Sequence, residues 1–268
     1  MKKIALVITF TLALFSCEKE NQGKIENTGI PLISKVLIDG DSFLEYSYYK
    51  TNLLNEEKNK FHYTKHSYND KNLLTASEFY MDPAMYSSSG IVIESAMKRK
   101  EWVNSKNTAK SLTITFEYND KEQLVRTIYI RPSVNNSEYS EFTWENDRIS
   151  RKTMYWQNEL SHYVDYSYDE KGNLIKQTKY RVPSTGPAEL LTTTEYEFDD
   201  MKNPYLSFKR LLTPGKYTNL NNITKETYTI HFEVDDFIQK VQSSNNTYEY
   251  NKWGYPVKVN GEAEYEYN

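Results

Sequence analysis

Apolar and polar side chains alternate along most of this chain with a period of two residues. In the segment 112–118 (LTITFEY) every even position is apolar or aromatic and every odd position is polar. The segments 44–48, 194–198 and 228–234 follow the same rule. Such alternation places one face of a segment on a core and the other in water, which is typical of antiparallel β-strands. A helix cannot place residues two apart on the same side.

A polar turn follows each of these predicted strands. Aromatic residues precede four of the turns, at Tyr118, Trp144, Tyr168 and Phe198, with spacings of 26, 24 and 30 residues. Asn and Asp dominate the turns themselves, and both tolerate the left-handed backbone that closes a hairpin. Further copies begin at Tyr68, Val234 and Tyr250. The chain is therefore predicted to repeat one β-hairpin with outer loops of variable length.

Hairpins of this kind are marginal alone, so the copies must pair side by side. We predict an all-β protein: a long antiparallel β-meander of roughly 14–18 strands, forming a strongly curved sheet or barrel-like half-shell with aromatics packed on one face. Residues 31–268 are expected to form this single domain. Two segments, 81–110 and 204–222, break the alternation. Long loops on a β-scaffold are where binding is usually sited, so both are candidate binding loops.

Residues 1–16 are predicted to be a signal peptide. Lys2 and Lys3 form a positively charged start, and the segment 4–15 is an apolar run of twelve residues interrupted only by threonines. Such a run is too short to span a membrane but suits a signal-peptide core. Residues 17–30 are polar and without periodicity, which is typical of a flexible tether.

The segment Leu14-Phe15-Ser16-Cys17 resembles the lipobox of bacterial lipoproteins. The resemblance implies cleavage between Ser16 and Cys17 and acylation of Cys17, which would attach the chain to a lipid bilayer. Cys17 is the only cysteine, so it cannot form an internal disulfide, and lipidation would consume the free thiol. The run Glu18-Lys19-Glu20 resembles the export signal of Bacteroidetes surface lipoproteins. The location this implies is the outer membrane or cell surface of a Gram-negative cell. An ordinary secretory signal is the alternative.

The hairpin copies resemble the YD repeats of Rhs-type proteins. The segments 199–205, 213–215 and 221–225 resemble more closely a group of β-meander lipoproteins of Bacteroidetes. The chain departs from the YD pattern in its irregular spacing and in having only one glycine-containing copy of the turn, at Gly172. Both resemblances rest on turn chemistry, so they imply a fold and no activity.

Charge and composition narrow the function classes. Loss of Lys2 and Lys3 with residues 1–16 would change the net charge from −4 to −6 and leave 252 of 268 residues. No basic patch indicates a nucleic-acid partner. Tyrosine supplies 24 positions, so the apolar faces are expected to be rich in tyrosine.

Candidate catalytic and metal-binding residues are few. His62 and His66 would lie about 13 Å apart in a strand, too far to share an ion. Acidic pairs such as Asp199-Asp200 and Asp235-Asp236 could serve as calcium ligands or glycosidase carboxylates, but their recurrence at hairpin turns favours a structural role. No phosphate loop, dinucleotide fingerprint, nucleophile elbow or HExxH motif occurs. We therefore predict no metal, no cofactor and no enzymatic activity.

Trp156 and Trp253 are the candidate ligand-stacking residues, because they lie outside the repeated aromatic position. Trp144 and Tyr168 occupy that position and are expected in the core. Three hypotheses follow. The chain is a lipid-anchored envelope scaffold or interaction protein, a surface glycan-binding module with co-planar exposed aromatics, or a hydrolase with two carboxylates facing each other in a cleft.

Overall fold

The computed structural model describes residues 31–59, 61–82, 108–132, 134, 137–233 and 239–268. Seventeen strands and one 3-10 helix, η2, are found in these ranges. The strands are β1 (Ile33–Ile38), β2 (Asp41–Tyr48), β3 (Leu54–Lys58), β4 (His62–Tyr68), β5 (Leu74–Met81), β6 (Ala109–Tyr118), β7 (Leu124–Ile130), β8 (Glu138–Glu145) and β9 (Arg148–Trp156). They continue with β10 (Glu159–Tyr168), β11 (Leu174–Arg181), β12 (Glu189–Lys202), β13 (Asn221–Ile230), β14 (Val241–Asn245), β15 (Tyr248–Tyr250), β16 (Pro256–Val259) and β17 (Ala263–Tyr267), with η2 (Pro204–Leu211) between β12 and β13.

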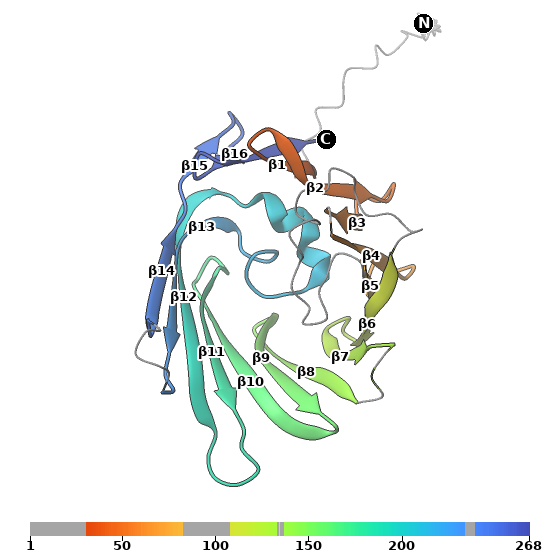
Figure 1. The fold of residues 1–268 in the computed structure, drawn as a ribbon, viewed down its shortest axis with the longest axis vertical. Helices are drawn as coiled ribbons and strands as arrows, with labels where there is room; N and C mark the ends of the chain where they lie inside the picture. Colours follow the sequence, from red (N-terminus) through yellow and green to blue (C-terminus); the bar gives the residue numbers. More distant parts are fainter. Residues whose placement is uncertain (1–30, 60, 83–107, 133, 135–136, 234–238) are drawn as a thin grey trace, which may run out of the picture.

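The strands form one antiparallel sheet in which sequence neighbours pair. The last strand returns to the first, so that β1 pairs with both β2 and β17. Within the described residues, β14 pairs with β13 and β15 with β16, but no pairing joins β14 to β15, so the sheet is not closed. Figure 1 shows the strands curving around the segment that contains η2. The predicted all-β meander and curved sheet are confirmed, and the strand number falls in the expected range.

Five turns share one hydrogen-bonding pattern. In each, the first residue donates its N–H to the carbonyl four positions later and accepts an N–H from three positions later, as in Asn119 with Gln123 and Glu122. The residue at that fourth turn position has positive φ, which suits Asn or Gly. The five turns begin at Tyr49, Asn69, Asn119, Asp169 and Asn251. The preference for Asn and Gly in these turns thus follows from one backbone requirement, a positive φ at the fourth position, which recurs along one edge of the sheet.

The aromatic residue at the end of the strand before a turn links neighbouring hairpins. We call these residues the pre-turn aromatics. The Tyr118 hydroxyl donates to the Leu74 carbonyl at 2.9 Å, and the Trp144 indole N–H donates to the Leu124 carbonyl at 2.7 Å. In each case the accepting residue opens the second strand of the preceding hairpin and is almost fully buried. The same bond joins Tyr48 to Ile33, Tyr68 to Leu54, Tyr168 to Ile149 and Tyr267 to Pro256. Trp144 and Tyr168, which the sequence predicts in the core, are half-buried.

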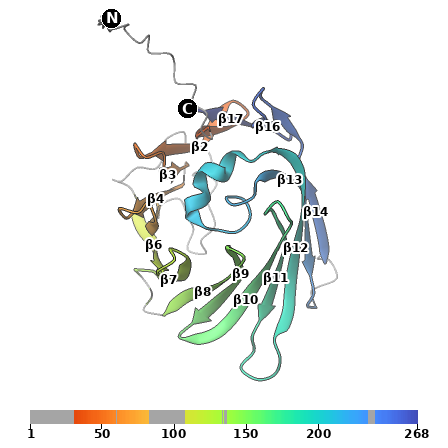
Figure 2. The same cartoon turned by 180° about the vertical axis from the view of Figure 1, so that it is seen from behind.

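The sequence predicts a turn after Phe198, but this residue lies inside β12, which continues to Lys202 before the chain leaves the sheet. We call residues 203–220 the plug. Asn203 caps η2 by accepting the N–H of Tyr205 at 2.9 Å, and Pro204 follows at the first helical position. Asn219 accepts the N–H of Leu174 at 2.7 Å, and Asn173 accepts the N–H of Leu220 at 2.8 Å. Asparagine side chains therefore cap η2 and tie the C-terminal end of the plug to the start of β11. Figure 2 shows the plug inside the curve of the sheet.

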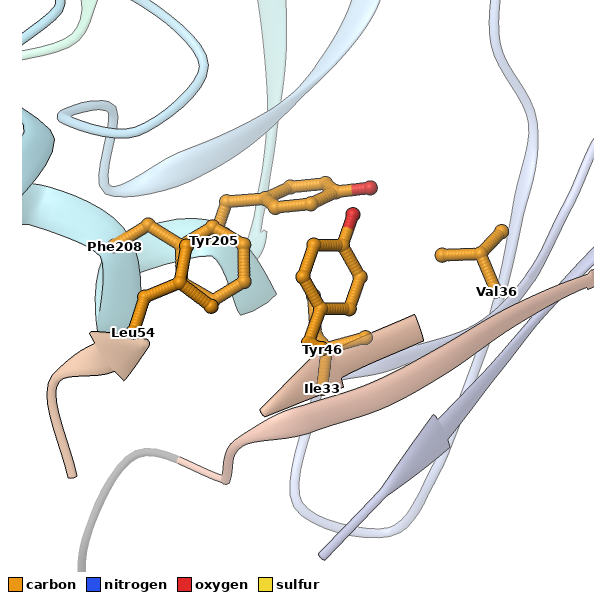
Figure 3. Packing of buried hydrophobic residues seen from close by; sticks show 6 residues of the cluster. All are labelled: Ile33, Val36, Tyr46, Leu54, Tyr205 and Phe208. Atoms are coloured by element: carbon orange, nitrogen blue, oxygen red, sulfur yellow. The ribbon is translucent and has the colours of Figure 1, made fainter. Parts of the chain in front are cut away.

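The plug supplies much of the apolar core. Phe208 is 1% exposed, and its ring centroid lies 5.1 Å from that of Tyr46 and 5.7 Å from that of Tyr205. These rings pack with Ile33, Val36 and Leu54 of the first three strands (Figure 3). Residues 204–211 therefore form a helix whose Tyr205 and Phe208 are buried within the curve of the sheet, and the expectation that the segment 204–222 binds a ligand stays a prediction.

Aromatic residues pack on both faces of the sheet, which corrects the prediction of one aromatic face. Cross-strand pairs stack with ring centroids 4.6–4.7 Å apart: Tyr63 with Tyr80, Tyr139 with Tyr155, and Tyr163 with Tyr180. These residues alternate along their strands with those that face the plug, so they lie on the outer face. The strand predicted for 228–234 is also shorter than expected, since β13 ends at Ile230.

Candidate functional site

The predicted lipidation site and most of the segment 81–110 lie outside the described residues. Ser16 and Cys17 lie outside the described residues, as do 83–107 and the turn residues Asp235-Asp236. No helix among the described residues is long and apolar enough to cross a membrane.

Trp156 and Trp253 are both exposed, at 47% and 63%. They lie at opposite ends of the strands. Trp156 pairs with Glu159 at the start of β10, whereas β10 ends at Tyr168 beside the turn that begins at Asp169. Ten residues of strand separate these ends by about 30 Å.

Trp253 lies on the same edge as the turn at Asp169. Lys171 of that turn contacts Asp200, near the end of β12, at 2.7 Å. The last residue of β12, Lys202, donates its N–H to the Gly254 carbonyl at 3.0 Å. The two tryptophans therefore share no groove, and the co-planar arrangement that the glycan hypothesis requires is not formed by this pair.

The acidic turn residues bind backbone. Asp169 accepts the N–H groups of Gly172 and Asn173 at 2.7 and 2.8 Å. Although partial burial acts in the other direction, these hydrogen bonds hold the pKa of Asp169 below its usual value. Asp199 accepts the N–H of Asn222 at 3.1 Å. The interpretation as a turn residue is confirmed for Asp169. It is wrong for Asp199, which lies inside β12 at an irregularity of the strand pairing between Phe198 and Lys202.

The histidines have separate neighbours. His62 contacts the Asn59 side chain, His66 is buried against the Ser77 hydroxyl at 2.9 Å, and His162 contacts Ser161. His231 contacts Thr193. Among the described residues, no group of three or more His, Cys, Asp or Glu side chains is arranged to hold a metal ion.

A cavity of about 290 Å³ lies between the plug and the inner face of β3–β10. The side chains that line the cavity alternate along each strand, because residues two apart face the same side of the sheet. The sheet side includes Phe79 of β5, Phe116 of β6 and Phe142 of β8, and the plug side includes Leu212 and Tyr217. The cavity was not anticipated, since it needs both the curvature of the sheet and the position of the plug.

One end of the cavity carries a positive charge. Lys152 of β9 donates to the Tyr129 hydroxyl at 3.2 Å, and its Nζ lies 5.7 Å from the centre of that ring. Thr127 is 3.5 Å from the same hydroxyl. Burial would raise the pKa of Tyr129, but Lys152 and hydrogen bonds from neighbouring hydroxyls outweigh it and lower the pKa.

The middle of the cavity is neutral. His66 is 5% exposed, and burial lowers its pKa to about 4, so the imidazole is uncharged near neutral pH. On β10, beyond Lys152, burial raises the pKa of the Tyr166 hydroxyl, so this group is also uncharged near neutral pH.

The other end contains Glu57. Burial raises the pKa of its carboxyl, and the positive charge of Lys216 acts in the opposite direction. Among the described residues that line the cavity, Glu57 is the sole carboxylate. The arrangement can bind a polar group at each end and an apolar body between them.

Sequence reasoning missed Lys152 and Tyr129. Their only signal is position. Lys152 lies on the same face of β9 as Met154, and Tyr129 lies on the same face of β7 as Thr127. The face of each strand that points inward is set by how the strands pair in the sheet. Neither residue can therefore be recognised before the strand pairing is known.

No protein-family model matches the sequence, and no curated protein matches it. Matches among solved structures include a porin-like protein from Bacteroides uniformis, at 11% identity and a TM-score of 0.43, covering 88% of this chain and 96% of that chain. A porin-like protein from Bacteroides vulgatus has 12% identity and a TM-score of 0.39, covering 89% of this chain and 99% of that chain.

The Tc holotoxin pore of Photorhabdus luminescens is a further neighbour. It has 14% identity and a TM-score of 0.30, and the match covers 76% of this chain but only 10% of the toxin chain. The structural neighbours are thus porin-like Bacteroides proteins and a toxin chain, at low identity and low TM-score.

Proposed function

We propose that this chain is a lipid-anchored protein of the cell envelope, attached through acylated Cys17 to the outer membrane or displayed at the cell surface. Its β-domain acts without catalysis, as a scaffold or interaction partner for other envelope components. The partners of this proposal are the bilayer and the molecules that the domain contacts.

The observation that carries the proposal is the segment Leu14-Phe15-Ser16-Cys17 at the end of a twelve-residue apolar run. Its cysteine is the only one in the chain, and lipidation gives the thiol a use. Two or more acyl chains bind a bilayer stably, because each buried CH₂ contributes about 0.8 kcal/mol. The tether predicted for residues 17–30 would connect the acylated cysteine to the domain, whose first strand begins at Ile33.

The experiment is metabolic labelling with an alkyne analogue of palmitate in a Bacteroidetes host. The wild-type chain is expected to incorporate label and to fractionate with the outer membrane. Cys17→Ala should lose the label, and globomycin should cause the uncleaved precursor to accumulate. Ser16→Ala is the matched control, since it keeps a small residue before the cysteine and should be labelled normally. An unlabelled wild-type chain would refute the anchor.

Two features support a role without catalysis. A glycosidase needs two carboxylates about 5–10 Å apart across a cleft, and Glu57 is the single carboxylate among the described cavity residues. Asp169 and Asp199 accept backbone N–H groups, and Asp200 pairs with Lys171. Incubation with a panel of chromogenic glycosides and esters should give no turnover above that of the heat-denatured chain.

Glycan binding is the second candidate, and the exposure of Trp253 favours it. Lys252 lies 4.5 Å from the Trp253 ring centre, so the exposed ring stands beside a polar partner. Aromatic faces of this kind stack on sugars. A glycan array tests the candidate: binding that Trp253→Ala removes and Trp156→Ala leaves intact supports it, and silence of the wild-type array eliminates it.

A further inference from the structure

We propose that the cavity between the plug and the inner face of the sheet binds a small amphipathic carboxylate. The acid group lies at Lys152 and Tyr129, and the apolar body lies along Phe116 and Phe79. This inference concerns what the β-domain binds, and it is independent of how the chain is attached to the membrane.

The charge of Lys152 is the first argument. Every other lysine or arginine that makes a hydrogen bond to a side chain on β6–β12 contacts a carboxylate, for example Arg151 with Asp165 and Lys176 with Glu195. Lys152 instead donates to a neutral phenol, and no carboxylate in the described residues lies within ion-pair distance of it. Phe142 and Val164 are its partners on the neighbouring strands. An apolar surrounding strengthens the attraction of a single cation for an anion.

The hydroxyl of Tyr129 is the second argument. Lys152 and neighbouring hydroxyls hold its pKa below the ordinary value, and a more acidic phenol is a better hydrogen-bond donor to an anion. Lys152 and Tyr129 together present an ammonium and a phenol side by side, which matches the two oxygens of a carboxylate. A phosphate dianion would need more positive charge than one lysine supplies.

The remaining walls select the body of the ligand. Next to Tyr129 in the sheet come β6 and β5, whose inward side chains include Ile114, Phe116 and Phe79. His66 and Tyr166 are uncharged near neutral pH, because burial lowers the pKa of the imidazole and raises the pKa of the phenol. A volume of about 290 Å³ lies at the low end of the range for small-molecule sites, so the ligand is small. A short fatty acid or an arylacetate has this chemistry.

Equilibrium dialysis of the full mature chain in amphipol against radiolabelled octanoate and phenylacetate tests the proposal. One molecule of at least one probe is expected to bind per chain. Lys152→Met keeps the length and removes the charge, and it should weaken binding at least tenfold. Tyr129→Phe should weaken it about threefold. The uncharged octanamide and phenylacetamide should bind at least tenfold more weakly than the acids.

Lys179→Met is the matched control. Lys179 lies on β11, pairs with Val164, and does not line the cavity, so its replacement should leave binding unchanged. Phe116→Trp fills the apolar part and should block binding while keeping Lys152, which covers the case in which Lys152→Met fails to fold. Equal binding by the wild type and Lys152→Met, equal weakening by Lys179→Met, or no saturable binding of either probe would overturn the proposal.

Discussion

The interior of the curved sheet differs between its two halves. Beside β1–β3 and β17, the plug fills the space with rings, and the buried residues are apolar or aromatic. Beside β4–β9, the buried side chains include Thr64, His66, Ser77, Thr127 and Ser140, and a cavity remains. The frame is the same in both halves, since Tyr48 and Tyr168 make the same bond to the preceding hairpin. The comparison shows that bonds from the pre-turn aromatics to backbone carbonyls hold neighbouring hairpins together in both halves. The inward side chains can therefore differ between the halves without changing the arrangement of the strands.

Removal of the central ring of the plug should have the largest effect. Phe208→Ala is expected to lower the free energy of unfolding by about 3–5 kcal/mol, because a fully buried ring leaves a cavity. Urea denaturation followed by circular dichroism measures this. Phe116→Ala, beside the existing cavity, should cost less than half as much, and Phe43→Ala, at 45% exposure, should cost little. Equal losses for Phe208 and Phe116 would contradict the difference between the two halves.

The buried histidine should make the cavity half sensitive to acid. The pKa of His66 falls from 6.5 to about 4 on folding, so between these values the unfolded state binds a proton that the folded state does not. Stability from this group is complete above pH 6.5, declines as pH falls, and is lost below pH 4, by about 3 kcal/mol in all.

His66→Phe removes this titration. The difference in unfolding free energy between wild type and His66→Phe should shift in favour of the variant as pH falls from 6.5 to 4. Denaturant titrations at several pH values measure it, and His231→Phe is the control because His231 is exposed. A constant difference across this range would disprove the role of His66.

The shared frame can be tested at one pre-turn aromatic. Tyr118→Phe removes the hydrogen bond to the Leu74 carbonyl and leaves a buried acceptor unpaired, so it should cost about 1 kcal/mol. Burial raises the pKa of this hydroxyl to about 12, so the loss should be the same at pH 6 and pH 9. Tyr168→Phe should cost a similar amount. Thermal unfolding of both variants measures the two losses of stability. Clearly unequal losses would contradict the idea that the same hydrogen bond holds both hairpins.

The smallest expected effect is a gain. Glu122 has φ of +60°, where neighbouring copies of the turn have Asn72 and Gly172. An ordinary side chain in this conformation costs about 1–2 kcal/mol, and glycine avoids that cost at the expense of some chain entropy. Glu122→Gly should therefore stabilise the chain by about 0.5–1 kcal/mol. Lys121→Gly, one position earlier without positive φ, should destabilise it, and a similar effect of both changes would count against the turn assignment.

The sequence predicted the repeated hairpins because their signals are local. Alternation of side chains and the Asn or Asp turns act over a few residues, as at 112–118 and Asn119. The plug was misinterpreted because Tyr205 and Phe208 are separated by helical spacing in a segment rich in Pro and Gly, and the strands they contact lie more than 140 residues earlier. The candidate site was missed for the same reason: Lys152 gains its meaning from β7 and β8, not from its sequence neighbours.

The pairing of the first strand with the last has a consequence for how the chain is assembled. Val36 meets Tyr265, which lies 229 positions later in the sequence. Hairpins from β2 to β13 can form from neighbours as the polypeptide emerges, but the rings around Ile33 need Tyr265 and Tyr267. Contacts of such long range form slowly, because a large loop must close before they contribute. We expect the apolar centre to be completed in the final step of folding, after the repeats have already formed.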